Sequence, residues 1–103
     1  MTTRELTEWT IEYLWRTRHA RLRRNSAAQK GHYAYGIKGW GDILGYGETG
    51  VFWVIEIKNS DTRDRQRGAQ TAMLEDAVRC GCVVATIKCC DDVMARWPQE
   101  VTG

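Results

Sequence analysis

The 103-residue sequence lacks the features that would place it in a membrane or a secretory pathway. It has no run of eighteen or more apolar residues, which a membrane-spanning helix needs, and no charged-then-apolar leader at its start. We therefore expect a cytoplasmic location, or a host cytoplasm if the source is a virus. Internal repeats, linkers and low-complexity tracts are also missing, and the length predicts one domain, residues 1–103, with one modest core.

Acidic residues are missing from the segment between Arg16 and Lys30, which reads RTRHARLRRNSAAQK. The net charge of the chain is only +2, so positive charge is concentrated in this basic block. Two interpretations are open. The block is either the exposed face of a helix, or a surface that follows DNA phosphates, since clustered Arg and Lys release counterions when they bind DNA.

The four cysteines lack the spacing of a zinc site. Cys80 and Cys82 form a C-x-C pair and Cys89 and Cys90 are adjacent, whereas zinc knuckles usually have C-x-x-C. We expect reduced thiols in a reducing compartment. The segment CVVATIKC, residues 82–89, is expected to be a buried strand, where free cysteine behaves as a small hydrophobe.

Three ionisable residues interrupt two segments that otherwise have the pattern of β-strands. Residues 51–55, VFWVI, are typical of a strand buried on both faces until Glu56 and Lys58 follow. Alternate side chains of a strand share a face, so Glu56 and Lys58 are expected on the same side. Asp42 lies in the earlier segment, and the turn-rich GYGETG between the two predicts an antiparallel pair that brings Asp42 beside them.

A simpler alternative is open for these charges. An aspartate next to glycine is often a turn residue, and a Glu and a Lys on one strand face are often a solvated pair. The same-face neighbours Phe52 and Val54 are apolar, however, and a charge pair at the end of an apolar face favours a site at the edge of the sheet.

The remaining pattern predicts an α/β fold. The first expected elements are a helix from Arg4 to about Arg18, capped by Thr2 or Thr3, and an irregular strand in GHYAYGIKG (31–39). The two strands described above come next, followed by a helix from Thr62 to Cys80 and a strand from Cys82 to Lys88. The last element is a short helix through Trp97, capped by Asp91 or Asp92 and stopped by Pro98. This order predicts a right-handed crossover onto a mixed sheet. In the first helix Glu8 and Glu12 share a face with Ile11 and Trp15, so one or both glutamates are expected to face the sheet.

Two converging carboxylates and a lysine fit metal-dependent phosphodiester cleavage. Asp42, Glu56 and the carbonyl of Ile57 would bind Mg²⁺, with Mn²⁺ as the alternative, and the cation would activate a water molecule. Lys58 would stabilise the pentavalent phosphorane or orient the attacking water.

The segments GWGDILGY, FWVIEIKNS and QTAMLEDAVRCGCVVATIKCCDDV together resemble the PD-(D/E)XK nuclease superfamily, specifically its virus-type replication-repair branch (VRR-Nuc) in the stand-alone form of phages and bacteria. The resemblance covers nearly the whole chain. It implies a restriction-endonuclease-like core of helix, three strands, helix and strand around a mixed sheet. It also implies an Mg²⁺-dependent endodeoxyribonuclease that cuts branched DNA such as Holliday junctions as a homodimer. The chain departs from the family where Trp40 and Gly41 replace the proline that usually precedes the aspartate.

The resemblance assigns roles to the acidic residues and the lysine. Asp42 and Glu56 match the metal carboxylates of the family, and Lys58 matches its catalytic lysine. Glu8 matches an acidic residue of the first helix that approaches the metal, with Glu5 and Glu12 as competing candidates.

The resemblance also assigns a glutamine and a DNA-contacting stretch. Gln70 fits the catalytic glutamine of the family helix better than Gln66 does, although a solvated helix glutamine is the simpler alternative. Arg24-Asn25-Ser26 resembles the family's R-x-N-S-like stretch. The expected DNA contacts are Arg21, Arg23, Arg24, Asn25 and Lys38.

Two functions remain open from the sequence. One is a structure-selective nuclease, and the other is a nucleic-acid binding or assembly module that keeps the fold without efficient cleavage. No membrane partner and no small-molecule cofactor beyond the metal is expected. The five tryptophans (Trp9, Trp15, Trp40, Trp53 and Trp97) are expected in the core or an interface rather than as base-stacking platforms.

Overall fold

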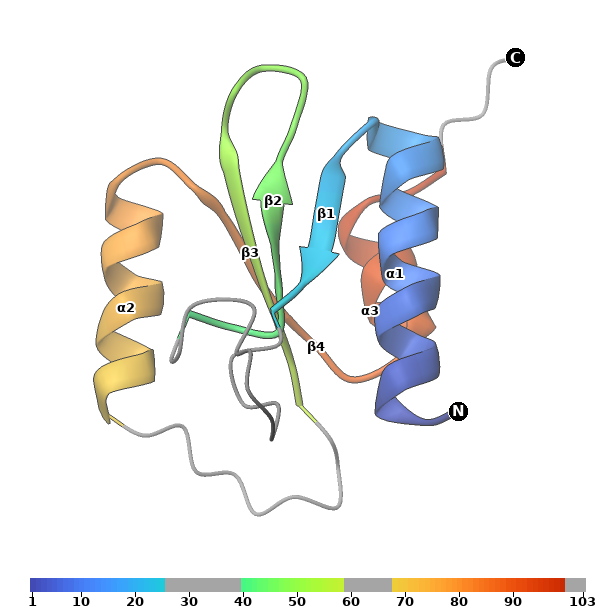
Figure 1. Cartoon of the computed structure of the whole chain (residues 1–103), viewed down its shortest axis with the longest axis horizontal. Coiled ribbons are helices and arrows are strands. Elements are labelled where there is room, and N and C mark those ends of the chain that lie inside the picture. Colours follow the sequence, from blue (N-terminus) through green and yellow to red (C-terminus); the bar gives the residue numbers. More distant parts are fainter. Residues whose placement is uncertain (26–39, 59–67, 100–103) are drawn as a thin grey trace, which may run out of the picture.

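The structure is a computed structural model that describes residues 1–25, 40–58 and 68–99. Over these ranges the chain is an α/β fold with a mixed sheet and helices on both of its faces (Figure 1). The elements are α1 (Thr3–Arg18), β1 (Arg21–Arg24), β2 (Ile43–Tyr46), β3 (Phe52–Ile57), α2 (Gly68–Arg79), β4 (Val83–Ile87) and α3 (Cys90–Arg96). The predicted order of elements and the mixed sheet are confirmed.

The four strands of this sheet lie in the order in which the chain makes them, β1-β2-β3-β4. The pairs β1–β2 and β2–β3 are antiparallel. The pair β3–β4 is parallel, because α2 returns the chain to the end of the sheet where β3 begins. In Figure 1, α2 lies on one side of the sheet, and α1 and α3 lie on the other.

The core is divided between the two faces of the sheet. The larger cluster lies between the sheet and helices α1 and α3, and its most deeply buried members are Leu14, Ile43, Ile55, Ile87 and Val93. On the other face Val54 packs with Leu74 and Ala77 of α2. Neighbouring residues of β3 therefore belong to opposite faces, as expected for a central strand.

The first strand differs from the prediction. It is β1, inside the basic block, while the segment 31–39 lies outside the described residues. Leu22 is buried in the larger cluster and pairs with Gly45 of β2, where a Cβ atom would collide with the carbonyl oxygen of Arg21. The helical interpretation of the basic block is thus wrong for β1. Within the described part of the block, it holds for Arg16 and Arg18 at the end of α1.

The helix ends show where local chemistry was predictable. Thr2 is the N-cap of α1 and forms a capping box with Glu5, as one of the two expected caps. Helix α2 begins at Gly68, and residues 62–67 of the predicted helix lie outside the described residues. The N-cap of α3 is Cys89 instead of an aspartate, because Asp92 lies inside the helix and accepts a hydrogen bond from the Lys88 N–H at 2.8 Å.

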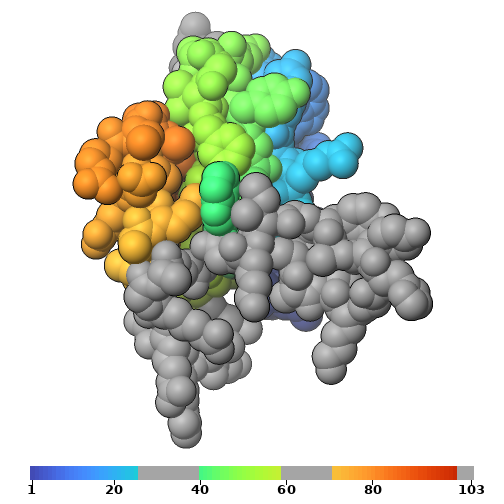
Figure 2. All heavy atoms as spheres, turned by 60° about the vertical axis from the view of Figure 1, so that its left-hand side comes forward, coloured from blue at the N-terminus to red at the C-terminus, as the bar shows by residue number. Residues whose placement is uncertain are grey.

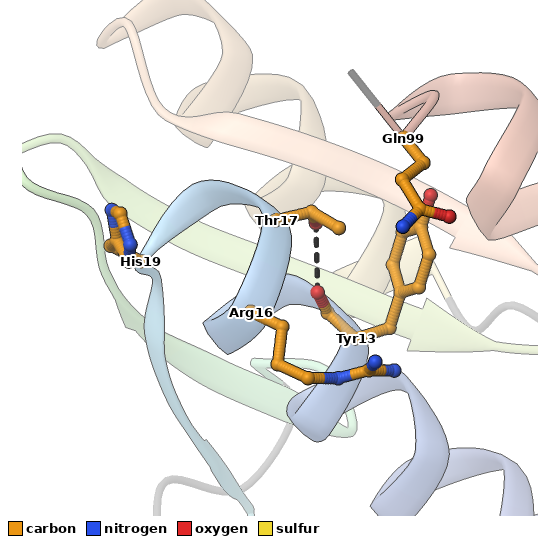
Figure 3. Close-up of a pocket in the computed structure, with 5 residues that line it drawn as sticks. All are labelled: Tyr13, Arg16, Thr17, His19 and Gln99. Atoms are coloured by element: carbon orange, nitrogen blue, oxygen red, sulfur yellow. Dashed lines mark hydrogen bonds between the residues drawn. The ribbon is translucent and has the colours of Figure 1, made fainter. Parts of the chain in front are cut away.

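The C-terminal half of α1 is tied to the chain that follows α3. The Tyr13 hydroxyl donates to the Trp97 carbonyl at 2.7 Å, and Arg18 Nη2 donates to the Pro98 carbonyl at 2.6 Å. A polar pocket of about 310 Å³ opens here, with Gln99 and Arg16 beside the Tyr13 ring (Figure 3). None of the helices in the described ranges is long and apolar enough to cross a membrane.

The cysteines and tryptophans agree in part with expectation. All four cysteines are free thiols, and Cys80 and Cys89 are exposed. Strand β4 is an edge strand in which only Ile87 is fully buried, so the prediction of a buried strand there is wrong. Trp53 and Trp97 stack in the core with ring centroids 5.3 Å apart, whereas Trp15 and Trp40 are exposed.

Candidate metal and nucleic-acid site

The candidate site lies at one end of the sheet. Figure 1 shows the end of β1, the start of β2, the end of β3 and the first turns of α1 and α2 at this end of the molecule. Because β3 and β4 are parallel, their carboxyl ends also meet here, which is where open α/β sheets commonly bind ligands.

Asp42 brackets Glu56 through two hydrogen bonds. Its backbone N–H donates to the Ile55 carbonyl at 3.0 Å, and its Oδ2 accepts from the Ile57 N–H at 2.7 Å. The residues before and after Glu56 are thus both bonded to Asp42. The prediction that an antiparallel pair places Asp42 beside Glu56 along the chain is confirmed.

Glu56 and Lys58 follow Val54 on the α2 face of β3. Glu56 is half-buried, and its Oε2 atom is shielded from solvent. Lys58 lies one residue past the strand, but its N–H still donates to the Ile87 carbonyl of β4 at 2.8 Å, so the strand geometry continues. The predicted shared face for these two side chains follows from this alternation.

Gly41 and Asn25 hold Asp42 in place. Gly41 has φ 107°, a conformation that side chains rarely allow, and a Cβ there would lie 3.5 Å from Glu56 Oε2. The Asn25 side chain donates from Nδ2 to the Gly41 carbonyl at 2.8 Å, and its backbone N–H donates to the Asp42 carbonyl at 2.7 Å. Asn25 therefore positions Asp42, and the DNA contact expected for Asn25 stays a prediction.

A polar pocket of about 350 Å³ opens beside Asp42. It lies where the first turns of α1 meet the end of β1. Its lining residues in the described part of the chain are Thr3, Arg4, Thr7, Arg24, Asn25 and Asp42. Guanidinium groups bind phosphate oxygens well, so the two arginines suit this pocket to a phosphate.

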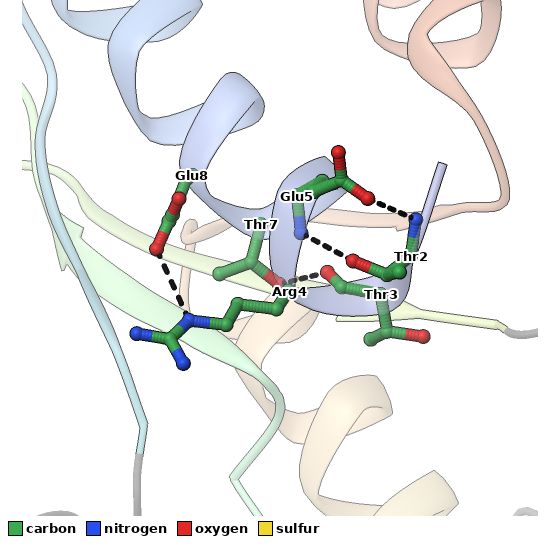
Figure 4. A network of polar contacts seen from close by, with 6 residues as sticks. All are labelled: Thr2, Thr3, Arg4, Glu5, Thr7 and Glu8. Carbon is green, nitrogen blue, oxygen red and sulfur yellow. Dashed lines mark hydrogen bonds and ion pairs between the residues drawn. The ribbon is translucent and has the colours of Figure 1, made fainter.

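The expectation that Glu8 and Glu12 face the sheet is wrong. The Glu8 side chain is 66% exposed and accepts from Arg4 Nε at 3.3 Å, and Glu12 pairs in the same way with Arg16 (Figure 4 shows Glu8 and Arg4). The buried positions of α1 include two threonines, Thr7 and Thr10, and this turns the glutamates toward solvent. Glu8 is therefore not brought to the other two acids as a metal ligand. The remaining candidate, Glu5, is in the capping box.

The other predicted residues fall into three groups. Gln70 lies in the first turn of α2, at the same end of the sheet as the acids. Arg21, Arg23 and Arg24 are all exposed on β1. Arg21 also donates to the His19 carbonyl and lies 5.1 Å from the Trp15 ring centre. Lys38 and Gln66 lie outside the described residues.

The donor set fits a hard divalent cation. Within residues 1–25, 40–58 and 68–99, no three His, Cys, Asp or Glu side chains gather as a metal-binding group, so the side-chain ligands expected here are limited to the pair Asp42 and Glu56. Mg²⁺ is usually held by one or two carboxylates and completes its octahedron with waters and substrate phosphates. The carbonyl of Ile57 stays the third protein ligand expected from the sequence.

Arg4 is the residue that sequence reasoning missed. The sequence predicts that Arg4 lies in the first turn of α1, close to the buried Leu6. Which end of α1 lies near Asp42 depends instead on how the helix packs on β1. A local pattern does not carry that information.

The comparisons with known proteins add no relative. No family model matches the chain, and no curated protein and no solved structure is significantly similar to it. The resemblance to VRR-Nuc nucleases therefore stays a prediction, carried by the motifs of the chain itself.

Proposed function

We propose that this protein is a metal-dependent endodeoxyribonuclease of the PD-(D/E)XK type, similar to the VRR-Nuc branch, that hydrolyses phosphodiester bonds in branched DNA as a homodimer. The observation that carries the proposal is the bracketing of Glu56 by Asp42 at the end of a mixed sheet. A carboxylate oxygen shielded from solvent favours a cation, because charge interactions are stronger where water is excluded. As part of the same proposal, we infer that the α/β fold is of the restriction-endonuclease-like type.

Each residue has a role in this chemistry. When bound, Mg²⁺ would polarise the scissile phosphate and lower the pKa of a coordinated water. Asp42 and Glu56 would hold the cation, and the bond from the Ile57 N–H orients the Asp42 carboxylate. The water oxygen bonds to phosphorus, one P–O ester bond breaks, and a proton passes to the leaving oxygen. Lys58 would stabilise the charge that develops on the phosphorane.

DNA binding would use the arginines near the site. Arg4 and Arg24 line the pocket beside Asp42 and would hold a phosphate next to the cleaved bond. Arg23, exposed on β1, extends this surface. Such contacts fix the position of the strand without reading its sequence, which suits an enzyme that recognises the shape of branched DNA.

The test is cleavage by charge-neutral variants on a panel of branched and linear DNAs. Asp42→Asn and Glu56→Gln each remove one ligand charge and almost no volume, so each should lower the cleavage rate by about 10²-fold or more while DNA binding is retained. Lys58→Ala should also lose turnover and still bind metal. EDTA should abolish cleavage by the wild type.

The matched control is Glu12→Gln, an exposed acid of α1 that pairs with Arg16. It should cut like the wild type, and circular dichroism should show that all variants fold. Wild-type turnover by Asp42→Asn or Glu56→Gln would overturn the metal assignment. A wild-type protein that binds the panel but cuts nothing with Mg²⁺ or Mn²⁺ would favour the alternative, a binding or assembly module.

A further inference from the structure

A second hollow lies on the α2 face of the sheet, between Trp40, the starts of β3 and β4 and the second half of α2. Its volume is about 320 Å³, at the lower end of the range of small-ligand pockets. Figure 2 shows this face, with α2 in yellow and orange beside the strands in green. The lining residues in the described part of the chain are Trp40, Phe52, Met73, Asp76, Ala77, Cys80 and Cys82.

The lining favours a flat apolar group over a phosphate. Apart from Asp76, the side chains are aromatic, aliphatic or sulfur-containing. The Asp76 carboxylate already accepts from Arg79 Nη2 at 3.0 Å through Oδ1, and its other oxygen can accept an N–H from the edge of a nucleobase. The lining of this hollow thus lacks the arginines that line the pocket beside Asp42.

Trp40 is held in a position suited to stacking. Its ring meets Phe52 edge-on, with ring centroids 6.2 Å apart and an interplanar angle of 81°. The Trp40 residue is nevertheless 39% exposed. The packing against Phe52 thus fixes the indole while leaving surface for a ligand.

The hollow is continuous with the candidate site through the chain. Trp40 is followed by Gly41 and Asp42, and two residues span at most about 7 Å. Neighbouring nucleotides of a strand in a duplex are about 3.4 Å apart along the axis. Phe52, on the other side of the hollow, lies four residues before Glu56 on β3, which is about 13 Å along the strand. A phosphate at Asp42 therefore brings a base of the same strand to the hollow within a few nucleotides.

We propose that this hollow binds one unpaired nucleobase of the strand whose phosphate lies at Asp42 and Glu56. The inference rests on the proposed nuclease function and adds its substrate class, DNA with an unpaired nucleotide within a few nucleotides of the cleaved bond. A paired base is stacked within its duplex and has to be extruded to enter a pocket, whereas an unpaired base enters at lower free-energy cost. Trp40 is then an exception to the expectation that the tryptophans are core or interface residues.

The test is binding in EDTA, where no metal-dependent cleavage occurs. Two probes carry the fluorescent base 2-aminopurine, one at an unpaired position of a branched DNA and one inside a fully paired duplex of the same sequence. Stacking on Trp40 should quench the unpaired probe on binding. Trp40→Ala should weaken binding of the branched probe by about tenfold, since stacking contributes about 1–3 kcal/mol per base and 1.4 kcal/mol is tenfold.

Two variants make the result specific. Tyr46→Ala removes an exposed aromatic side chain of β2 that does not line the hollow, and it should bind both probes like the wild type. Trp40→Phe should keep most of the preference for the unpaired base. An equal loss of affinity for both probes in Trp40→Ala, no loss at all, or no quenching in the wild type would overturn the proposal.

The outcome is independent of cleavage. If Asp42→Asn cut DNA at the wild-type rate, the metal assignment would fail while quenching by Trp40 would still be measurable in EDTA. If Trp40→Ala kept the wild-type affinity for the unpaired probe, the base site would fail while the metal-dependent cleavage stood.

Discussion

At the scale of single residues, Gly41 explains how the chain manages without the proline that the family resemblance leads one to expect before Asp42. Its φ of 107° turns the backbone into β2 so that both the N–H and the carboxylate of Asp42 reach β3. A side chain at Gly41 would meet Val54 Cγ1 at 3.0 Å as well as Glu56. Glycine is therefore required here for space and for conformation alike.

Thr10 provides a test of packing in α1 that is separate from the site. It is fully buried, and among the described residues its hydroxyl has no hydrogen-bond partner. Thr10→Val replaces the hydroxyl by a methyl group of similar size, so we expect an increase in the free energy of unfolding of about 1 kcal/mol, measured by urea denaturation. In the control Thr7→Val, the lost hydroxyl donates to the Thr3 carbonyl at 2.8 Å, and no such gain is expected. Equal effects of the two changes would contradict this account of Thr10.

At the scale of elements, the start of α1 makes stability depend on pH. The Thr2 backbone N–H donates to Glu5 Oε1 at 2.9 Å, and this bond, with a smaller effect of the Thr2 side chain, lowers the pKa of Glu5 below its ordinary value of 4.5. A lowered pKa in the folded state means that charged Glu5 stabilises the fold above pH 4.5, and that this contribution is lost as the pH falls through the lowered pKa.

We therefore expect Glu5→Gln to reduce the acid sensitivity of α1. Glutamine can still accept the hydrogen bond of a capping box, but it does not titrate. Between pH 5 and pH 3, about the range in which glutamate titrates, the melting temperature of the wild type should fall more than that of Glu5→Gln. Parallel melting curves for the two proteins over this range would show that the capping box has no part in acid unfolding.

The exposed strand β1 allows a second test at this scale. Charge-neutral changes at Arg21, Arg23 and Arg24 should weaken DNA binding on every sequence, and each lost phosphate contact should reduce the slope of log affinity against log salt by about one unit. Arg24 should have the clearest effect because it lines the pocket beside Asp42. Arg96→Gln, on α3 against the Trp97 ring, is the control and should leave the slope unchanged. An unchanged slope in all three β1 variants would show that these arginines do not contact DNA phosphates and are simply solvated.

The elements also show what local patterns can predict. Strand β3 was predictable because it is buried on both faces, and the turn before it placed Asp42 beside Glu56. Strand β1 was not predictable, because Leu22 is its single buried residue and one apolar position cannot show the alternation of apolar and polar residues that marks a strand. The orientation of α1 was missed for a related reason. Thr7 and Thr10 are polar in type yet buried by the fold, and only tertiary packing determines that.

At the scale of the whole molecule, the aromatic residues of α1 are unevenly covered. Tyr13 is buried and stacks with the half-buried Trp9, with ring centroids 4.9 Å apart. Trp15, by contrast, is 44% exposed near the end of the helix. The sheet formed by the described residues thus covers one side of α1 and leaves Trp15 partly exposed. Tryptophan is enriched at protein interfaces, so Trp15 marks the part of α1 to test for a partner.

Resolution of a four-way junction requires two coordinated cuts on strands related by a two-fold axis, and one chain has a single candidate site. Two copies with a matching axis supply that geometry. We therefore expect a two-fold homodimer with α1 in its interface, so that light scattering should give about twice the 11.8 kDa of one chain, with or without junction DNA. Trp15→Glu places a charge in that interface and should yield monomers, whereas Tyr46→Ala, which also removes exposed aromatic surface, should leave the dimer intact. A wild-type protein that stays monomeric even on the junction would leave the nuclease chemistry standing and remove its assignment to junction resolution, because a single copy cannot place two symmetric cuts.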